Sequence, residues 1–209
     1  MTARIPAPST LRGRSIELTP IDENDLPALF AAIGRPEVFA SGYGGGPNGY
    51  RDSLDGFIEF ARSYYVWNGD GTTFVARRLG DTSGELLGTS TLGDLDLTHE
   101  HAHIGWTAWT PSVWGTAVNP EAKLLMLDHA FGHGFGRVKL QADILNSRSQ
   151  AAILKLGATF EGVIRRHMRR ADGSWRDSAV YSIVVDEWPG IRTALVERVD
   201  LLNAGGKNE

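Results

Sequence analysis

The sequence predicts a single-domain α/β protein whose central sheet is mixed and flanked by helices. Segments in which apolar and polar residues alternate recur along the chain, and segments with apolar residues at helical spacing separate some of them. Near the end of the chain, an Asp172-Gly173 pair joins two alternating segments, which is a strong hairpin signal. A helix between neighbouring strands makes them parallel and a hairpin makes its strands antiparallel, so both kinds of pairing are expected.

The elements are expected in a definite order along the chain. In the first half, strands cover residues 14–18, 72–79, 85–96 and 102–109, with helices over 25–33 and 53–64 after the first strand. In the second half, a helix over 119–135, a strand over 137–143 and a helix over 147–156 precede the hairpin strands 159–170 and 178–185. Residues 1–209 are read as one domain, with 1–12 and 203–209 as flexible ends.

The composition argues against several classes of protein. A formal net charge of −4 counts against general nucleic-acid binding, which needs a basic excess. The chain has no cysteine, which excludes disulfides, thiolate metal sites and thiol nucleophiles. The N-terminus lacks the apolar core of a signal peptide, and no apolar run is long enough to span a membrane. We therefore expect a cytoplasmic protein without membrane attachment, as a monomer or homodimer.

The segment 104–130 has the pattern of an anion site at the start of a helix. A strand ends near Pro111, a loop containing Gly115 follows, and Asn119 can cap the next helix with Pro120 at its first position. The loop and the helix start present unpaired backbone N–H groups, whose favourable dipole suits a pyrophosphate. Gly115 and the small Ala117 would let a phosphate approach the backbone closely.

A second group of polar residues follows the next strand. Asn146 and Ser149 come directly after strand 137–143 and open a short helix that Gly157 ends. The Asn146 side chain can form hydrogen bonds where two strands diverge, and the Ser149 hydroxyl can donate a proton to a leaving thiolate.

Together, the two segments resemble the RimJ/RimL branch of the GNAT superfamily of N-acetyltransferases. The segments are WGTAVNPEAKLLMLDHAF and DILNSRSQAAILKLGATFEG, and weaker likeness extends from RSIELTPID to VYSIVVDEW. The resemblance implies a GNAT-like acyl-CoA N-acyltransferase fold, acetyl-CoA as co-substrate and no metal. It also implies direct transfer of an acetyl group to a primary amine, either a protein N-terminus or a small molecule.

The resemblance also implies where acetyl-CoA binds. The diverging parallel strands would be 102–109 and 137–143, with pantetheine along the first strand and pyrophosphate on the following loop. The residues that this implies for the co-substrate are Trp106, Thr107, Ala108, Trp109, Val113, Trp114, Gly115, Thr116, Ala117, Val118, Asn119, Asn146 and Ser149.

The sequence departs from the family pattern at positions that matter for catalysis. Ser112 replaces the usual Gln or Arg that opens the phosphate loop, and Ala117 replaces its second glycine. Ile153 stands where many members have a tyrosine acid, so the resemblance implies Ser149 as the acid, with Asn146 as an orienting group. His103 stands where members often have a glutamate. A histidine of ordinary pKa near 6.5 can act as a base at neutral pH.

Several features allow more than one interpretation. His99, His101 and His103 would share one side of a strand, as bases or as solvated side chains. His129 and His133 have the spacing of two metal ligands but lack the glutamate of a zinc protease motif, which favours structural histidines. The departures at the acid and base positions leave a non-catalytic acyl-CoA sensor as the alternative function.

Three further groups have a functional and a structural interpretation. The arginines around His167 could attract an acidic acceptor or CoA phosphates, or could lie on a solvated strand: Arg165, Arg166, Arg169 and Arg170. Tryptophans could line an acceptor pocket or belong to the core, with Trp114 beneath the phosphate loop: Trp106, Trp109, Trp114 and Trp175. The glycine-rich segment 41–50 could be an acceptor lid with contacts from Tyr43 and Tyr50, or a loose connection.

Overall fold

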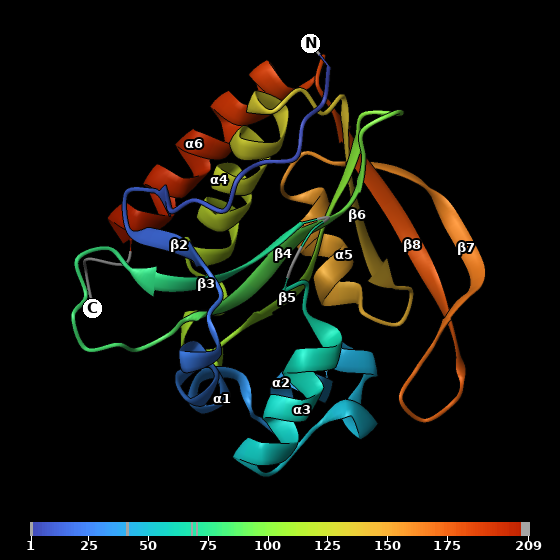
Figure 1. Ribbon diagram of the computed structural model, residues 1–209. Helices are drawn as coiled ribbons and strands as arrows, with labels where there is room; N and C mark the ends of the chain where they lie inside the picture. Colours follow the sequence, from blue (N-terminus) through green and yellow to red (C-terminus); the bar gives the residue numbers. More distant parts are fainter. Residues whose placement is uncertain (1, 41, 68, 70, 206–209) are drawn as a thin grey trace.

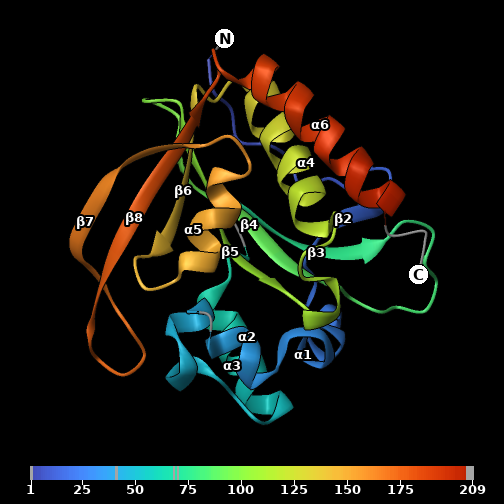
Figure 2. The same cartoon turned by 180° about the vertical axis from the view of Figure 1, so that it is seen from behind.

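The fold is built on one mixed sheet with helices on both faces (Figures 1 and 2). The computed structural model describes residues 2–40, 42–67, 69 and 71–205. The strands are β1 (Leu11–Arg12), β2 (Ile16–Pro20), β3 (Thr72–Arg78), β4 (Gly88–Asp96), β5 (His101–Trp109), β6 (Arg137–Asp143), β7 (Thr159–Arg169) and β8 (Trp175–Val184). The α-helices are α1 (Leu26–Ile33), α2 (Pro36–Ala40), α3 (Leu54–Tyr64), α4 (Val118–Gly132), α5 (Ser147–Leu154) and α6 (Trp188–Gly205).

The strand order confirms the predicted mixed sheet. The eight strands lie in the order β1-β2-β3-β4-β5-β6-β8-β7. The pairing of β5 with β6 is parallel, since α4 connects them, and the other pairings are antiparallel. The β7–β8 hairpin turns at Gly173, which adopts a φ of +82°.

Two hydrophobic clusters lie on opposite faces of the sheet. The larger cluster joins the sheet to α4, α5 and α6, with Met126, Phe135 and Leu195 buried in it. The smaller cluster holds α1, α2 and α3, and includes Phe39 and Phe57. Both views show α4 and α6 side by side, with α1–α3 at the opposite end of the molecule (Figures 1 and 2).

The sequence prediction omitted three elements and placed the end of a fourth too late. The prediction omitted α6, although Ile191, Leu195 and Val199 repeat at helical spacing, and Leu195 and Val199 are buried. It also omitted the short elements α2 and β1, which are below the length at which periodicity identifies an element. α4 ends at Gly132 rather than at residue 135, and Gly134 then adopts a φ of +86°.

The segment at the N-terminus makes specific contacts. Ala3 is buried, and the N–H of Arg4 donates to the carbonyl of His133 at 3.0 Å. β1 then pairs with β2, so residues 2–12, expected to be a flexible end, lie against the fold. At the other end, α6 includes residues 203–205, while residues 206–209 lie outside the described part of the chain.

A buried carboxylate on α4 anchors the chain between β1 and β2. Glu121 is 1% exposed and accepts hydrogen bonds from the N–H of Ser15 at 2.9 Å, from the N–H of Arg14 and from the Ser15 hydroxyl. These donors satisfy the carboxylate, which would otherwise be costly to bury.

Replacing Glu121 with alanine is expected to lower the free energy of unfolding by about 2–4 kcal/mol, because buried donors lose their acceptor. Urea denaturation of Glu121→Ala and Glu121→Gln measures the effect, and the glutamine should retain part of the stability. Glu197→Ala, at an exposed position on α6, is the control. Equal losses of unfolding free energy in Glu121→Ala and Glu197→Ala would show that the hydrogen bonds of Glu121 do not stabilise the fold.

No helix among the described residues combines the length and the apolar character needed to cross a membrane.

Candidate functional site

The two parallel strands separate at the centre of the sheet, as the sequence predicted. β5 and β6 pair only through three register positions, the last joining His103 to Lys139. Beyond that point the strands diverge and leave a cavity of about 290 Å³ between them and α5. Most of the predicted co-substrate residues line it: Trp106, Thr107, Ala108, Trp109, Val113, Trp114, Gly115, Asn119, Asn146 and Ser149. Thr116, Ala117 and Val118 lie in the adjoining loop and helix start rather than in its wall.

The edge of β5 that faces this cavity is locally distorted. The register between β4 and β5 shifts between Thr89 and Thr91, and opposite it Trp106 adopts a φ of +50°. A positive φ at a tryptophan is strained and persists only where the surroundings impose it. The bulge interrupts the ladder next to the diverging strands, where an extended ligand could pair with the β5 backbone.

The loop before α4 has the donors of an anion site. Pro111–Val113 form a short 3₁₀ turn, and Gly115 adopts a φ of +82° that favours glycine. Within the described residues, the N–H groups of Gly115, Ala117 and Asn119 have no backbone acceptor. These free donors at the positive end of a 15-residue helix can bind a pyrophosphate.

Two predicted details of this loop are wrong. Asn119 does not cap α4, because Ala117 occupies the cap position and the Asn119 side chain instead accepts a hydrogen bond from the Trp109 indole at 2.9 Å. Trp114 does not pack beneath the loop: it is 36% exposed, and the Arg148 guanidinium lies 4.0 Å from its ring centroid. Arg148 thereby places a positive charge beside the loop before α4, which the sequence analysis did not anticipate.

Asn146 and Ser149 lie together at the start of α5. Asn146 is the N-cap residue, and its Oδ1 accepts from the Ser149 N–H at 2.9 Å. The Ser149 side chain lines the 290 Å³ cavity, and its hydroxyl makes no hydrogen bond with another described residue. The cap fixes the first turn of α5, so the hydroxyl is held at the cavity wall and can donate there.

A second, larger cavity of about 930 Å³ adjoins the first. Gly105, Trp106 and Arg176 line both cavities, so the two meet at the β5 bulge. His103 lies in the wall of the larger cavity and is 3% exposed. Its neighbour Gly105 leaves room for the ring, since a Cβ at that position would lie 2.8 Å from the imidazole Nε2.

The imidazole of His103 is held by a carboxylate. Its Nδ1 lies 2.9 Å from Oδ2 of Asp94, which is also 3.3 Å from the Lys139 ammonium. Asp94 adopts a φ of +48° at an irregular part of β4, which turns its side chain toward the ring. Within the described residues, Nε2 has no hydrogen-bond partner. We assign the proton to Nδ1, facing the carboxylate, which leaves the lone pair on Nε2.

The pKa values of this pair favour a neutral imidazole. The hydrogen bond from His103, with smaller contributions from the charges of His103 and Lys139, lowers the pKa of Asp94 to about 2. Burial lowers the pKa of His103 below its usual value, and the hydrogen bond with Asp94 offsets this in part. A neutral, oriented imidazole is the form that accepts a proton.

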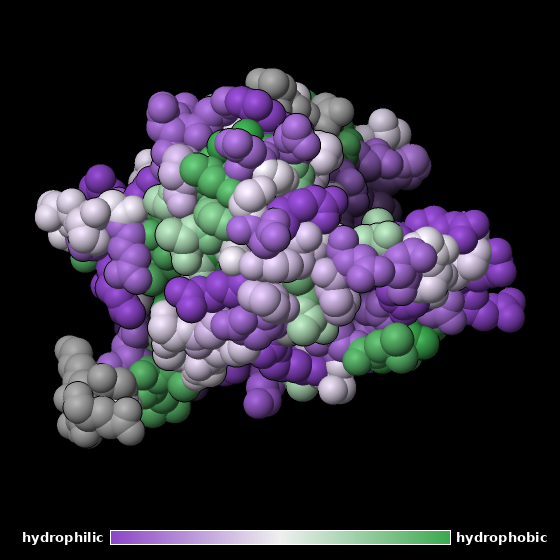
Figure 3. Space-filling model, turned by 90° about the horizontal axis from the view of Figure 1, so that it is seen from below, coloured by the Kyte–Doolittle hydropathy of each residue, from purple (hydrophilic) through white to green (hydrophobic). Residues whose placement is uncertain are grey.

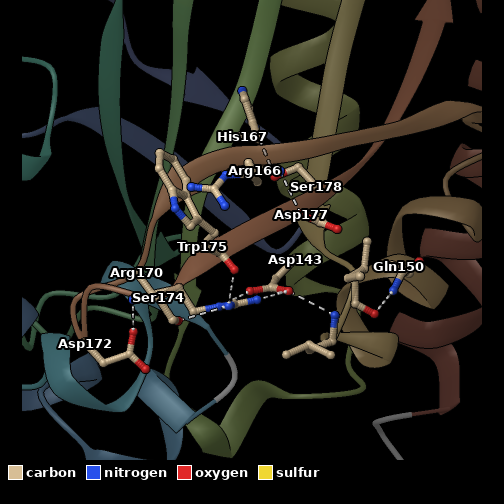
Figure 4. Close-up of polar contacts among 12 residues, drawn as sticks. Asp143, Gln150, Arg166, His167, Arg170, Asp172, Ser174, Trp175, Asp177 and Ser178 are labelled. Atoms are coloured by element: carbon tan, nitrogen blue, oxygen red, sulfur yellow. Dashed lines mark hydrogen bonds and ion pairs between the residues drawn. The ribbon is translucent and has the colours of Figure 1, made fainter.

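The roof of the larger cavity joins two segments distant in the sequence. The N–H of Ala171, in the β7–β8 turn, donates to the carbonyl of Gly45 at 3.1 Å. Figure 4 shows the Arg170 guanidinium beside the carboxylate of Asp143 at the end of β6, at 2.7 Å and 2.9 Å. Arg170 also donates to the carbonyl of Trp175, so it fixes the turn over the cavity.

This arrangement resolves several open interpretations. The glycines of segment 42–47 line the cavity, but Tyr43 is buried against Tyr65, and Tyr50 packs on Phe39. Tyr50 therefore supports the fold, whereas Tyr43 also lines the smaller cavity, and Ser41 lies outside the described residues. Arg166 and Arg169 stack on Trp175, which places this tryptophan in the hairpin surface rather than in the core.

His167 on β7 lies in the wall of the same larger cavity as His103, with its Nδ1 3.0 Å from the Ser178 hydroxyl, whereas the other four histidines do not line that cavity. His99 lies in the turn before β5 and pairs with Asp96 at 2.8 Å, so the three histidines do not share one strand. The His129 and His133 rings lie 4.5 Å apart, and Nδ1 of His133 contacts the carbonyl of His129 at 2.7 Å. Over residues 2–40, 42–67, 69 and 71–205, no group of three or more possible ligands could hold a metal ion.

The sequence analysis did not identify Lys123, a buried lysine beneath the β5 bulge. The Lys123 ammonium donates to the hydroxyls of Ser90 at 2.7 Å and Thr107 at 2.6 Å. Burial lowers its pKa to about 7. The sequence did contain a signal for this buried lysine. Lys123 stands on a side of the helix that is otherwise apolar, where a lysine is rarely found unless it has partners.

Comparison with known proteins identifies the family. The family model described as "Acetyltransferase (GNAT) domain" matches residues 15–159, most of the chain. The chain belongs to the GNAT acetyltransferase family. No curated protein sequence matches it significantly. The family match confirms the expected GNAT family, and the solved structures described next confirm the GNAT fold, while the RimJ/RimL-like branch stays a prediction.

Solved structures show the same fold over nearly the whole GNAT domain. A protein of T. thermophilus, titled as an acetyltransferase, is 30% identical, covering 93% of this chain and 99% of its own with a TM-score of 0.81. RimJ of Mycobacterium smegmatis, in complex with CoA-disulfide, is 22% identical, covering 91% and 95% with a TM-score of 0.70. RimL, titled a ribosomal L7/L12 alpha-N-protein acetyltransferase in complex with coenzyme A, is 16% identical, covering 85% and 99% with a TM-score of 0.67.

Proposed function

We propose that this GNAT protein is an acetyl-CoA-dependent N-acetyltransferase that acts on a primary amine. The observation that carries the proposal is the meeting of two cavities at the β5 bulge. One cavity lies between the diverging strands below the phosphate loop, and the other contains His103 with an unpartnered Nε2. An amine in the larger cavity would reach a thioester held in the smaller one.

The residues of the smaller cavity fit the co-substrate. The free N–H groups of Gly115, Ala117 and Asn119 would hold the pyrophosphate, with Arg148 nearby as a cation. The β5 backbone from Trp106 to Trp109 would pair with pantetheine where β6 no longer does. Acetyl-CoA supplies the acetyl group as an activated thioester.

The chain's own side chains would complete the proton transfers. With a small movement of the cavity wall that exposes the buried Nε2, His103 would accept a proton from the attacking amine, and Asp94 would hold the ring. A carbon–nitrogen bond forms and the carbon–sulfur bond breaks. The Ser149 hydroxyl would protonate the departing thiolate. The proton that His103 accepts is passed through solvent to Ser149, which restores both residues, so the products are an N-acetylamine and CoA thiol.

The first experiment measures CoA thiol release from acetyl-CoA with a panel of peptide N-termini, amino acids and small amines. Amine-dependent release with a matching acetylated product would support the proposal. Acetyl-CoA binding without release for any amine would instead favour an acyl-CoA sensor. Absence of binding would contradict the role of the loop before α4.

Ser149→Ala is expected to lower kcat by about tenfold, because a thiolate with a pKa near 8.5 leaves readily even without a proton donor. Steady-state kinetics at saturating acetyl-CoA measures the change. Ser63→Ala, at an exposed position of α3 outside both cavities, is the control. A Ser149→Ala enzyme with the kcat of the control would remove this serine from the mechanism.

A further inference from the structure

We infer that Arg176 makes the acceptor cavity a carboxylate-binding site, so that the preferred acceptor is a primary amine with a carboxylate close to its amino group. The inference rests on the proposed function and names the class of acceptor. It depends on the charges around the larger cavity, on the pairing of those charges and on the position of Arg176 where the two cavities meet.

The larger cavity has an excess of positive charge. Two carboxylates line it, Asp94 and Asp143, against the basic side chains Lys139, Arg148, Arg169, Arg170 and Arg176. Seen from the end of the molecule that carries α1–α3, the surface mixes hydrophilic, neutral and hydrophobic residues (Figure 3). The excess of positive charge in the cavity favours an acceptor that carries negative charge.

Both carboxylates already have partners. Asp94 lies between His103 and Lys139, and Asp143 pairs with Arg170 in a bidentate arrangement (Figure 4). Because Arg170 binds both oxygens of Asp143, this carboxylate does not form a direct ion pair with a second guanidinium such as that of Arg176.

Most of the other basic groups are also engaged. Arg148 lies over Trp114 beside the phosphate loop, and Arg169 lies 3.9 Å from the Trp175 ring centroid and donates to the carbonyl of Gly173 at 2.5 Å. Neither guanidinium is therefore the free cation that an anionic acceptor would require.

Arg176 is the exception within the described residues. Its guanidinium forms no ion pair or hydrogen bond with any of them, and its Nε is buried without an acceptor. Burial lowers its pKa, and the nearby charge of Asp143 offsets this in part. The guanidinium stays protonated in proteins, so a cation without a partner faces the cavity. A planar carboxylate would satisfy it with two parallel hydrogen bonds.

The position of Arg176 limits where that carboxylate lies in the acceptor. Arg176 lines both cavities, as do Gly105 and Trp106 at the β5 bulge. The amine must also reach this junction to attack the thioester. The carboxylate is therefore near the amine, as in a free amino acid or in a peptide that begins with Asp or Glu.

The test compares acceptors that differ only in charge. Glycine with glycinamide, and Asp-Ala-amide with Asn-Ala-amide, form matched pairs that separate free amino acids from acidic peptides. For the wild-type enzyme, kcat/KM should be higher for the carboxylate member of at least one pair by about 10- to 100-fold. In Arg176→Met, KM for that member should rise until the preference is lost, with kcat/KM for the amide little changed. Arg176→Lys should restore part of the preference.

Calorimetric titration of each variant with acetyl-CoA separates this inference from the proposed function. Unchanged acetyl-CoA affinity with lost carboxylate preference supports the role of Arg176. Equal kcat/KM values within both pairs, or equal losses for both members in Arg176→Met, would overturn it while leaving the acetyltransferase intact. Bound acetyl-CoA without turnover of any amine would overturn the proposed function, and this inference with it.

Discussion

Replacing His103 with alanine is expected to lower kcat by about 10²- to 10³-fold, while the dissociation constant of acetyl-CoA stays within about twofold. The expectation follows from geometry. The imidazole is 3% exposed, its Nδ1 is held by Asp94 at 2.9 Å, and its Nε2 is unpartnered within the described residues. Single-turnover kinetics and calorimetric titration measure the two quantities separately.

The pH dependence provides a sharper test of the same residue. Burial lowers the pKa of His103 below 6.5, so the base is neutral at pH 7 and is lost only as the pH falls below that value. The wild-type kcat/KM should therefore decline on the acidic side of pH 6.5. Asp94→Asn removes the hydrogen bond and the charge that raise this pKa. We expect its acidic limb at lower pH and its maximal rate reduced, with one acceptor used throughout.

A matched pair of residues outside both cavities provides the control. His99 and Asp96 form the same kind of contact at 2.8 Å, but both side chains are exposed. His99→Ala and Asp96→Asn should leave kcat and the acidic limb unchanged. A wild-type acidic limb that persists in His103→Ala, or that does not move in Asp94→Asn, would assign the titration to another group.

Replacing Lys123 with methionine is expected to stabilise the fold by about 2–4 kcal/mol at pH 7 and below, since it removes a buried charge. Burial lowers the pKa of Lys123 from 10.5 to about 7. Between these pH values the unfolded chain binds more protons than the folded one, so wild-type stability should rise with pH across this window. Below pH 7 both states are protonated, and the cost of the buried charge is constant.

Denaturant unfolding at intervals from pH 6 to pH 10 measures the effect. The stability advantage of Lys123→Met should shrink as the pH rises from 7 towards 10, because the folded wild-type protein then buries a neutral amine and its stability rises, whereas the methionine does not titrate. Lys155→Met, at an exposed position, should match the wild type in its pH dependence. A Lys123→Met protein that is less stable at every pH would show that the bonds to Ser90 and Thr107 outweigh the cost of burial.

The sequence predicted most of the sheet because its strands and connections carry local signals. Alternation identified β5 and β6, and the helix between them required that they be parallel. Asp172-Gly173 fixed the last hairpin. The family likeness was also readable in the chain, because the loop before α4 and the start of α5 are continuous segments. The sequence prediction omitted helix α6 although its apolar residues repeat at helical spacing. The elements α2 and β1 are too short to show any such repeat.

The sequence by itself determined the mixed sheet and the family, since both depend on patterns within continuous segments of the chain. The anion site in the loop before α4 and the roles of Ser149 and His103 stay predictions that the family resemblance implies. Only the tertiary structure brought Asp94 to His103, Lys123 beneath the β5 bulge and Arg170 onto Asp143. The two residues of each pair lie on different elements, so the pattern of residues along the chain does not predict how far apart their side chains are. The same holds for Arg176: whether a guanidinium is paired or free depends on every charge that the fold places around it.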